Sequence, residues 1–135
     1  MLCKCIFCLQ TEKEFSLQHS ATVNRAYNTL QKPLARGLYM LRLSEENLEH
    51  EMQIAMPEFF DEILEVNEAI SDADSPDVVA VIAVENQAKI DDLVCRISQA
   101  FKQKDHATAR DLLLRLKYYS NVAEKINNVL QKYVG

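Results

Sequence analysis

The sequence predicts an all-α protein, on three observations. The chain of 135 residues has only two glycines and three prolines, too few for many short strands joined by tight turns. Apolar residues recur three and four positions apart over most of its length, which is the spacing of a helix face. The one run that resembles a buried strand, 78–84, has no second strand candidate to pair with, so we interpret it as helix.

The composition fits a soluble globular protein and excludes several kinds of site. Hydrophobic residues make up 48% of the chain and charged residues 26%. Because Gly37 and Gly135 are the only glycines, the sequence cannot contain a glycine-rich phosphate loop or a dinucleotide-binding loop. It also cannot contain the glycine-flanked nucleophile elbow of the hydrolases. The longest apolar run, 78–84, is far shorter than the ~20 residues of a membrane span. We expect no membrane partner.

Charge is distributed unevenly along the chain, whose net charge is −5. Residues 44–77 hold twelve acidic residues and no Lys or Arg, whereas the segments on both sides are net basic. Such a block repels nucleic acid and favours a basic protein partner. The absence of tryptophan also argues against base stacking, so no nucleic-acid partner is expected. A solvated helix face is the alternative interpretation of the acidic block.

Three of the four cysteines lie close to the N-terminus. Cys5 and Cys8 form a C-x-x-C pair beside Cys3, but a structural zinc site normally needs a second pair, so no metal is predicted. The sequence leaves open what these three thiols do. Cys95 has apolar neighbours on a predicted helix, where we expect it to be a small buried hydrophobe.

The N-terminal part of the chain predicts two helices separated at Pro33. This proline ends the helix over 11–30 and suits the first turn of a helix over 33–43, because that turn leaves its N–H groups unpaired. Gly37 lowers helix propensity and is expected to permit close helix approach. The apolar stripes consist of Phe15, Val23, Ala26, Tyr27 and Leu30, with His19 on the same face, and of Leu34, Leu38 and Leu41. They can pack as a hairpin with part of their surface uncovered.

A helix predicted over 57–72 has two apolar faces. Its core stripe consists of Phe59, Ile63, Val66 and Ile70. Phe60 and Leu64 lie roughly 90–130° around the helix from that stripe, at the edge of an acidic surface. These two residues either widen the core stripe or form an exposed apolar pair, and the periodicity leaves both interpretations open.

Two long helices complete the prediction. Ser75, Pro76 and Asp77 are typical of a helix start, and that helix continues to about Gln103. Asp105 is placed to cap the last helix. Its heptad-like seam consists of Leu112, Leu116, Tyr119, Ala123, Ile126, Leu130 and Tyr133. Tyr119 is therefore expected in the core and Tyr118 at its periphery, in a long antiparallel hairpin.

Several segments resemble the HscB-type iron–sulfur cluster co-chaperones, a family of J-domain proteins. Two segments are similar to the end of the J-domain: QHSATVNRAYNTL, from Gln18 to Leu30, and KPLARGLYML, from Lys32 to Leu41. FFDEILEVNE from Phe59 resembles the first helix of the C-terminal domain, and LKYYSNV from Leu116 resembles a segment of its last helix. The resemblance implies an unassigned N-terminus over 1–10, a truncated J-domain remnant over 11–43, a linker over 44–55 and a three-helix scaffold-binding domain over 56–135.

The resemblance also implies a function and a site. In this family the J-domain stimulates the ATPase of a DnaK/HscA-class heat-shock chaperone, and the C-terminal domain binds the scaffold protein on which iron–sulfur clusters are assembled. Carried over by position, the partner-binding residues are Phe60, Leu64, Glu65, Glu68, Asp72 and Tyr118. Neither a cofactor nor a catalytic residue is implied. The family indicates a mitochondrial location, although no transit peptide is visible; otherwise the location is cytoplasmic.

The chain departs from the family at the motif that activates the chaperone. A working J-domain needs a His-Pro-Asp tripeptide, and none of His19, His50 and His106 precedes a proline. The first two J-domain helices are not matched either. We therefore expect scaffold binding without ATPase stimulation, in a native chain, a splice variant or an incorrect gene model.

Two other classes of function make different demands on the sequence. A helical adaptor or dimerising hairpin would self-associate through the 112–133 seam and the uncovered face of the J-domain remnant. A carboxylate-bridged dimetal enzyme would need Glu-x-x-His pairs, but Ser16, Asn47 and Gln103 stand three residues before the histidines. We therefore predict a protein that is not an enzyme.

Overall fold

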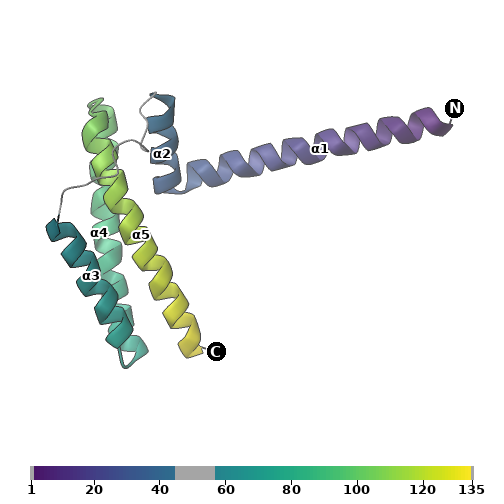
Figure 1. The fold of residues 1–135 in the computed structure, drawn as a ribbon. Coiled ribbons are helices and arrows are strands. Elements are labelled where there is room, and N and C mark those ends of the chain that lie inside the picture. The colour runs from purple at the N-terminus through teal and green to yellow at the C-terminus, as the bar shows by residue number, and fades with distance from the viewer. Residues whose placement is uncertain (1, 45–56, 135) are drawn as a thin grey trace. The chain divides into compact units, whose positions relative to one another are not determined.

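The computed structural model describes residues 2–44 and 57–134, with side chains from residue 6 onward. The described residues form five helices and no strand (Figure 1). These are α1 (Leu2–Gln31), α2 (Pro33–Leu43), α3 (Pro57–Asp72), α4 (Pro76–Lys102) and α5 (His106–Val134). The all-α prediction is confirmed, including the helical interpretation of 78–84. Nearly all of the predicted linker, 45–55, lies outside the described residues.

The chain divides into two compact units, Met1–Tyr39 and Met40–Gly135. The first contains α1, which begins at Leu2, so residues 2–10 extend the helix predicted over 11–30. The apolar stripe of α1 is exposed along its length: Phe15, Val23, Tyr27 and Leu30 are each more than half exposed. The stripe of α1 is therefore uncovered along its whole length, and it is not partly covered by a hairpin partner as expected.

Helix α2 begins at Pro33 as predicted and spans the boundary between the two units. Its apolar stripe is better covered than that of α1, because Leu34 and Leu38 are half-buried and Leu41 is fully buried. Gly37 is buried too.

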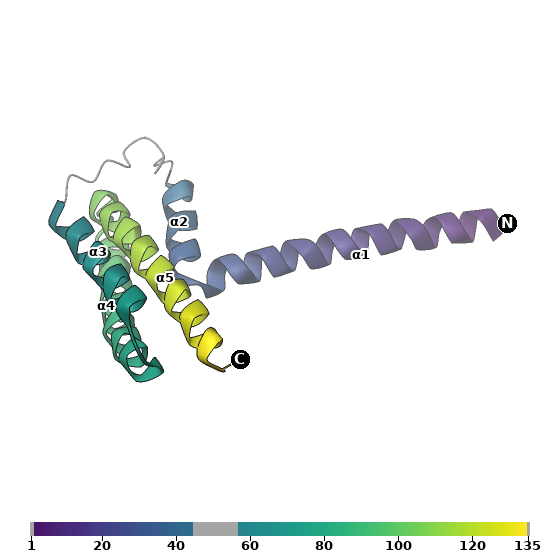
Figure 2. The same cartoon turned by 60° about the horizontal axis from the view of Figure 1, so that its bottom comes forward.

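The second unit is built around a three-helix bundle. Helices α3, α4 and α5 lie side by side in both views, with α4 antiparallel to both neighbours, so that α3 and α5 run in the same direction (Figures 1 and 2). The core side chains are Phe59, Ile63 and Ile70 from α3, Val79, Leu93, Ile97 and Ala100 from α4, and Leu112, Leu113, Leu116, Tyr119, Val122 and Ile126 from α5. Three of the four residues of the predicted core stripe of α3 are buried and the fourth, Val66, is half-buried, and the antiparallel α4–α5 hairpin is confirmed.

One polar side chain is buried in this core. Asn86 of α4 is 5% exposed, and its Nδ2 donates a hydrogen bond of 3.1 Å to the backbone oxygen of Tyr119 on α5. The bond joins the two long helices at mid-length and satisfies a group whose burial would otherwise cost free energy.

Of the two N-cap residues predicted for the long helices, Asp105 makes side-chain capping bonds and Ser75 does not. Asp105 caps α5, because its Oδ1 and Oδ2 accept hydrogen bonds from the backbone N and Oγ1 of Thr108 at 3.2 and 2.6 Å. These bonds lower the pKa of Asp105, the side-chain bond most. Ser75 has the extended backbone of an N-cap residue, but its hydroxyl makes no capping bond. The start of α4 therefore depends on Pro76 in the first turn.

The prediction for Cys95 is wrong. This residue is exposed, because the core-facing residues Leu93 and Ile97 are each two positions away and so point to the other side of the helix. The seam of α5 is also shorter than expected. Leu112, Leu116, Tyr119 and Ile126 are buried, whereas Ala123 and Leu130 are half-buried and Tyr133 is 46% exposed.

Candidate protein-binding surface

An aromatic cluster joins the first turn of α3 to the middle of α5. The ring of Phe60 meets that of Tyr118 edge to face, with 5.4 Å between centroids and 89° between planes. Phe59 lies beneath this pair, 7% exposed, with its centroid 5.7 Å from the rings of Phe60, Tyr118 and Tyr119. Tyr119 is buried and Tyr118 half-buried, as predicted. The buried ring of Phe59 supports the outer pair.

The two apolar residues that the periodicity set apart from the core stripe are exposed. The side chain of Phe60 is 39% exposed and that of Leu64, one turn later, is 57% exposed. Phe60 and Tyr118 thus lie together, and Leu64 continues the apolar strip along α3. The interpretation that these residues widen the core does not fit their exposure.

The three acidic residues carried over by resemblance are all exposed on α3. Phe60, Leu64, Glu68 and Asp72 follow one another at intervals of four, so the acids continue the apolar strip toward the end of the helix. Glu65 lies about half a turn around the helix from Phe60, on the far side of this row. The structure therefore brings Phe60 and Tyr118 together, with Leu64 one turn along α3, and places Glu65, Glu68 and Asp72 on the exposed surface beside them.

A lysine of α5 reaches onto the same side of α3. The Nζ of Lys125 lies 3.2 Å from the backbone oxygen of Asn67, 3.4 Å from its Oδ1 and 3.3 Å from the Oγ of Ser71. Further along, the hydroxyl of Tyr133 is 3.4 Å from the backbone oxygen of Ala73. These contacts fix the end of α3 to α5.

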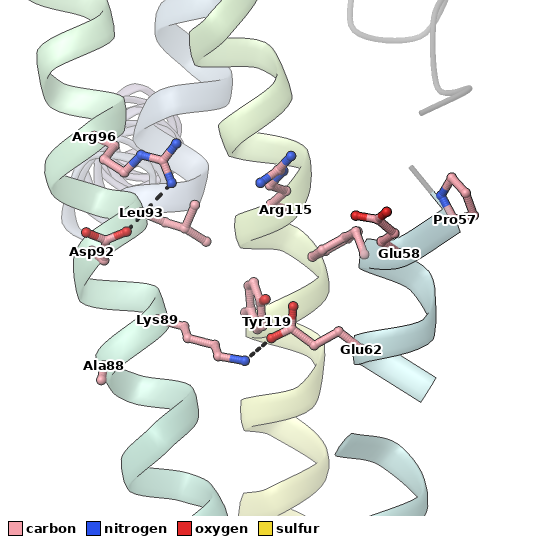
Figure 3. A pocket seen from close by; sticks show the side chains of 11 residues that line it. Pro57, Glu58, Glu62, Ala88, Lys89, Asp92, Leu93, Arg96, Arg115 and Tyr119 are labelled. Carbon is pink, nitrogen blue, oxygen red and sulfur yellow. Dashed lines mark hydrogen bonds and ion pairs between the residues drawn. The ribbon is translucent and has the colours of Figure 1, made fainter. Parts of the chain in front are cut away.

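A cleft of about 910 Å³ lies where the N-terminal half of α3 meets α4 and α5 (Figure 3). Lys89 of α4 pairs with Glu62 of α3 across it, and its Nζ lies 5.5 Å from the ring centroid of Tyr119. Burial raises the pKa of Tyr119, against a smaller lowering by Arg115. Acidic and basic side chains line the cleft in equal number, so its charge selects no ionic ligand.

Neither a metal site nor a membrane span is found in the part of the chain that the structure describes. No group of three or more His, Cys, Asp or Glu side chains there could hold a metal ion. Cys8 is exposed, and the side chains of Cys3 and Cys5 lie outside the described residues. No described helix is long and apolar enough to cross a bilayer.

Sequence reasoning missed the residues that hold α3 in place, namely Glu62, Asn67, Lys89 and Lys125. Each lies beside a core position on its helix, where a polar residue looks like ordinary solvated surface. One signal was available: Asn67 and Lys125 each follow a member of the Phe60–Tyr118 pair by seven residues, which is about two helical turns.

Comparison with known proteins gives one consistent relationship. A family model described as the HSCB C-terminal oligomerisation domain matches residues 55–127. The iron-sulfur cluster co-chaperone protein HscB of Mus musculus is 42% identical over 118 residues, which are 87% of this chain and 50% of that protein. The mitochondrial J-type co-chaperone JAC1 of Saccharomyces cerevisiae is 31% identical over 113 residues, 79% of this chain and 61% of that protein.

Solved structures agree with this relationship. The crystal structure of human co-chaperone protein HscB matches with a TM-score of 0.79 at 39% identity, over 87% of this chain and 60% of that one. The chain spans about half the length of the mammalian relatives that it matches.

Proposed function

Because the chain belongs to the HscB family of iron–sulfur cluster co-chaperones, we propose that it binds the scaffold protein on which such clusters are assembled. The binding surface in this proposal is the strip of Phe60, Leu64 and Tyr118, with Glu65, Glu68 and Asp72 at its edge. The role is partner binding rather than catalysis, because the relatives are named co-chaperones.

One observation carries the proposal: an exposed apolar strip supported from below and bordered by acids. Phe60 and Leu64 expose 39% and 57% of their surface although a buried stripe is available on the same helix. The ring of Phe60 is nevertheless held in an edge-to-face contact with Tyr118. Rigid aromatic anchors of this kind supply most of the energy of small interfaces. The partner therefore offers an apolar recess with a basic rim.

The test is calorimetric titration of the purified scaffold into the chain and into its Phe60→Ala/Leu64→Ala variant. We expect the variant to lose about 2–4 kcal/mol of binding free energy, or roughly 30- to 1,000-fold in Kd, while its helicity is unchanged. The matched control is Val81→Ala/Val84→Ala on α4, where the side chains are 59% and 71% exposed but lie on another helix. Equal affinity of both variants and the parent chain would refute the site.

The proposal assigns no ATPase stimulation to this chain. Residues 11–43 correspond to the J-domain remnant, and the sequence has no His-Pro-Asp tripeptide. A DnaK/HscA-class chaperone and scaffold, assayed at steady state, should therefore show no added ATP hydrolysis with this chain. A chain with a complete J-domain joined to residues 11–135 serves as the positive control. Equal stimulation by the two would show that the missing tripeptide is not decisive. On the basis of the family, we propose that the scaffold binding takes place in the mitochondrion.

Self-association is the second candidate function, and the exposed stripe of α1 favours it. Phe15, Val23, Tyr27 and Leu30 expose 54–65% of their surfaces, and such extended apolar faces are rare on monomers. Light scattering over a concentration series, for the parent chain and for Phe15→Ser/Tyr27→Ser, tests this function. A monomeric mass for the parent chain at all concentrations would eliminate it.

A further inference from the structure

Two contacts two turns apart set the register between α3 and α5. Phe60 and Tyr118 are separated by 58 residues in sequence, and so are Asn67 and Lys125. The same offset at both points means that the two parallel helices keep one register over this length. Leu64 stands between these two points on α3. The direction in which the Leu64 side chain points, relative to Tyr118, therefore depends on both contacts.

The aliphatic contacts of α3 do not fix this register by themselves. A stripe of aliphatic side chains packs over a range of rotations and shifts, because dispersion contacts have little directional preference. Hydrogen bonds are directional, and an ammonium group has three N–H donors. Lys125 has three oxygen acceptors on α3 within 3.2–3.4 Å. Its positive charge also lies near the C-terminal end of α3, where the helix dipole favours a cation.

We propose that Lys125 is a positioning residue for the binding surface: it fixes the rotation of α3 so that Phe60 and Leu64 face the partner beside Tyr118. This inference rests on the proposed function. Lys125 itself does not attract the partner in this account. Its charge opposes the binding of a basic scaffold, and its contribution comes from the three hydrogen bonds to Asn67 and Ser71.

The opposing signs of these two effects give a sharp experiment. In Lys125→Met the side chain keeps an unbranched apolar stem, one atom shorter than that of lysine, and loses its charge and donors. If the lysine acted only through its charge, the variant would bind a basic partner more tightly. If it positions α3, we expect binding to weaken about tenfold, as the loss of a charged hydrogen-bond group predicts. Lys132→Met, on the exposed side of α5, is the matched control for charge alone and should not weaken binding.

Lys125→Arg tests whether donors and charge together restore the surface. A guanidinium also donates hydrogen bonds but in a planar arrangement. We therefore expect the affinity of Lys125→Arg for the scaffold to lie between the affinities of the parent chain and of Lys125→Met. Affinity of Lys125→Met equal to or tighter than that of the parent chain would overturn the proposal. So would equal losses for Lys125→Met and Lys132→Met.

A second readout needs no partner. Amide hydrogen exchange over Asn67–Asp72, and the ring-current shift of the Leu64 methyl groups by NMR, both report the position of α3. Both should change in Lys125→Met and remain unchanged in Lys132→Met. A changed exchange rate with unchanged affinity would reduce Lys125 to a structural residue and overturn the proposal. If the parent chain does not bind the scaffold, the proposed function fails, and the shift of Leu64 alone decides whether Lys125 positions α3.

Discussion

Replacing Phe59 by Leu tests whether the buried ring supports the exposed pair. Leucine still fills an apolar site, but the substitution removes three ring contacts, to Phe60, Tyr118 and Tyr119, all with centroids at 5.7 Å. An aromatic pair contributes about 0.5–1.5 kcal/mol beyond its buried area. Because the three contacts share one ring, the energies are not additive, and we expect unfolding free energy to fall by about 1.5–3 kcal/mol.

The assay is urea unfolding followed by circular dichroism, with scaffold affinity measured on the same samples. Phe101→Leu is the matched control, because Phe101 is half-buried on α4 and its ring centroid lies 6.2 Å from that of His106. We expect Phe59→Leu to lose both stability and affinity, and Phe101→Leu to lose less stability and no affinity. A loss below about 0.5 kcal/mol in Phe59→Leu, the usual range for surface substitutions, would refute the supporting role of this ring.

Two further predictions concern charge. Stopped-flow association with the scaffold should slow severalfold between low and high salt, because charges on Glu68 and Asp72 are screened beyond about 8 Å at physiological ionic strength; an unchanged rate would exclude steering by α3. Bonds from Thr108 lower the pKa of Asp105 in the folded chain. The stability that the ionised Asp105 carboxylate contributes is therefore present above the pKa that this group has in the unfolded chain, and it is lost as pH falls through the lower pKa of the folded chain. Asp105→Asn should therefore flatten the acid side of the stability profile, below about pH 4.

Periodicity predicted the helices and the core because both depend on local sequence. The bounds 57–72, the burial of Phe59, Ile63 and Ile70, and the different environments of Tyr118 and Tyr119 all follow from a turn of 3.6 residues. The error at Cys95 came from its apolar neighbours in sequence, which suggested burial, whereas the same periodicity turns that position outward.

Contacts between helices could not be predicted in this way. The pairing of Lys125 with Asn67, and of Lys89 with Glu62, depends on how far each helix is shifted along its neighbour. A hydrophobic pattern defines which side of a helix faces inward but does not define that shift. The extension of α1 to Leu2 was missed for another reason: apolar residues and cysteines occupy nearly every position over 2–9, so no stripe on one side marks a helix there.

The 58-residue separation of Phe60 and Tyr118 has a consequence for synthesis of the chain on a ribosome. At about 5–20 residues per second, Phe60 leaves the peptidyl-transferase centre roughly 3–12 s before Tyr118 is added. During that interval α3 has neither the tyrosines that hold its aromatic residues nor the lysine that fixes its end. Phe59, Ile63 and Ile70 are then uncovered together with Phe60 and Leu64, which gives the nascent chain a broader apolar helix than the finished protein has. The surface proposed to bind a partner is thus completed only when α5 is made.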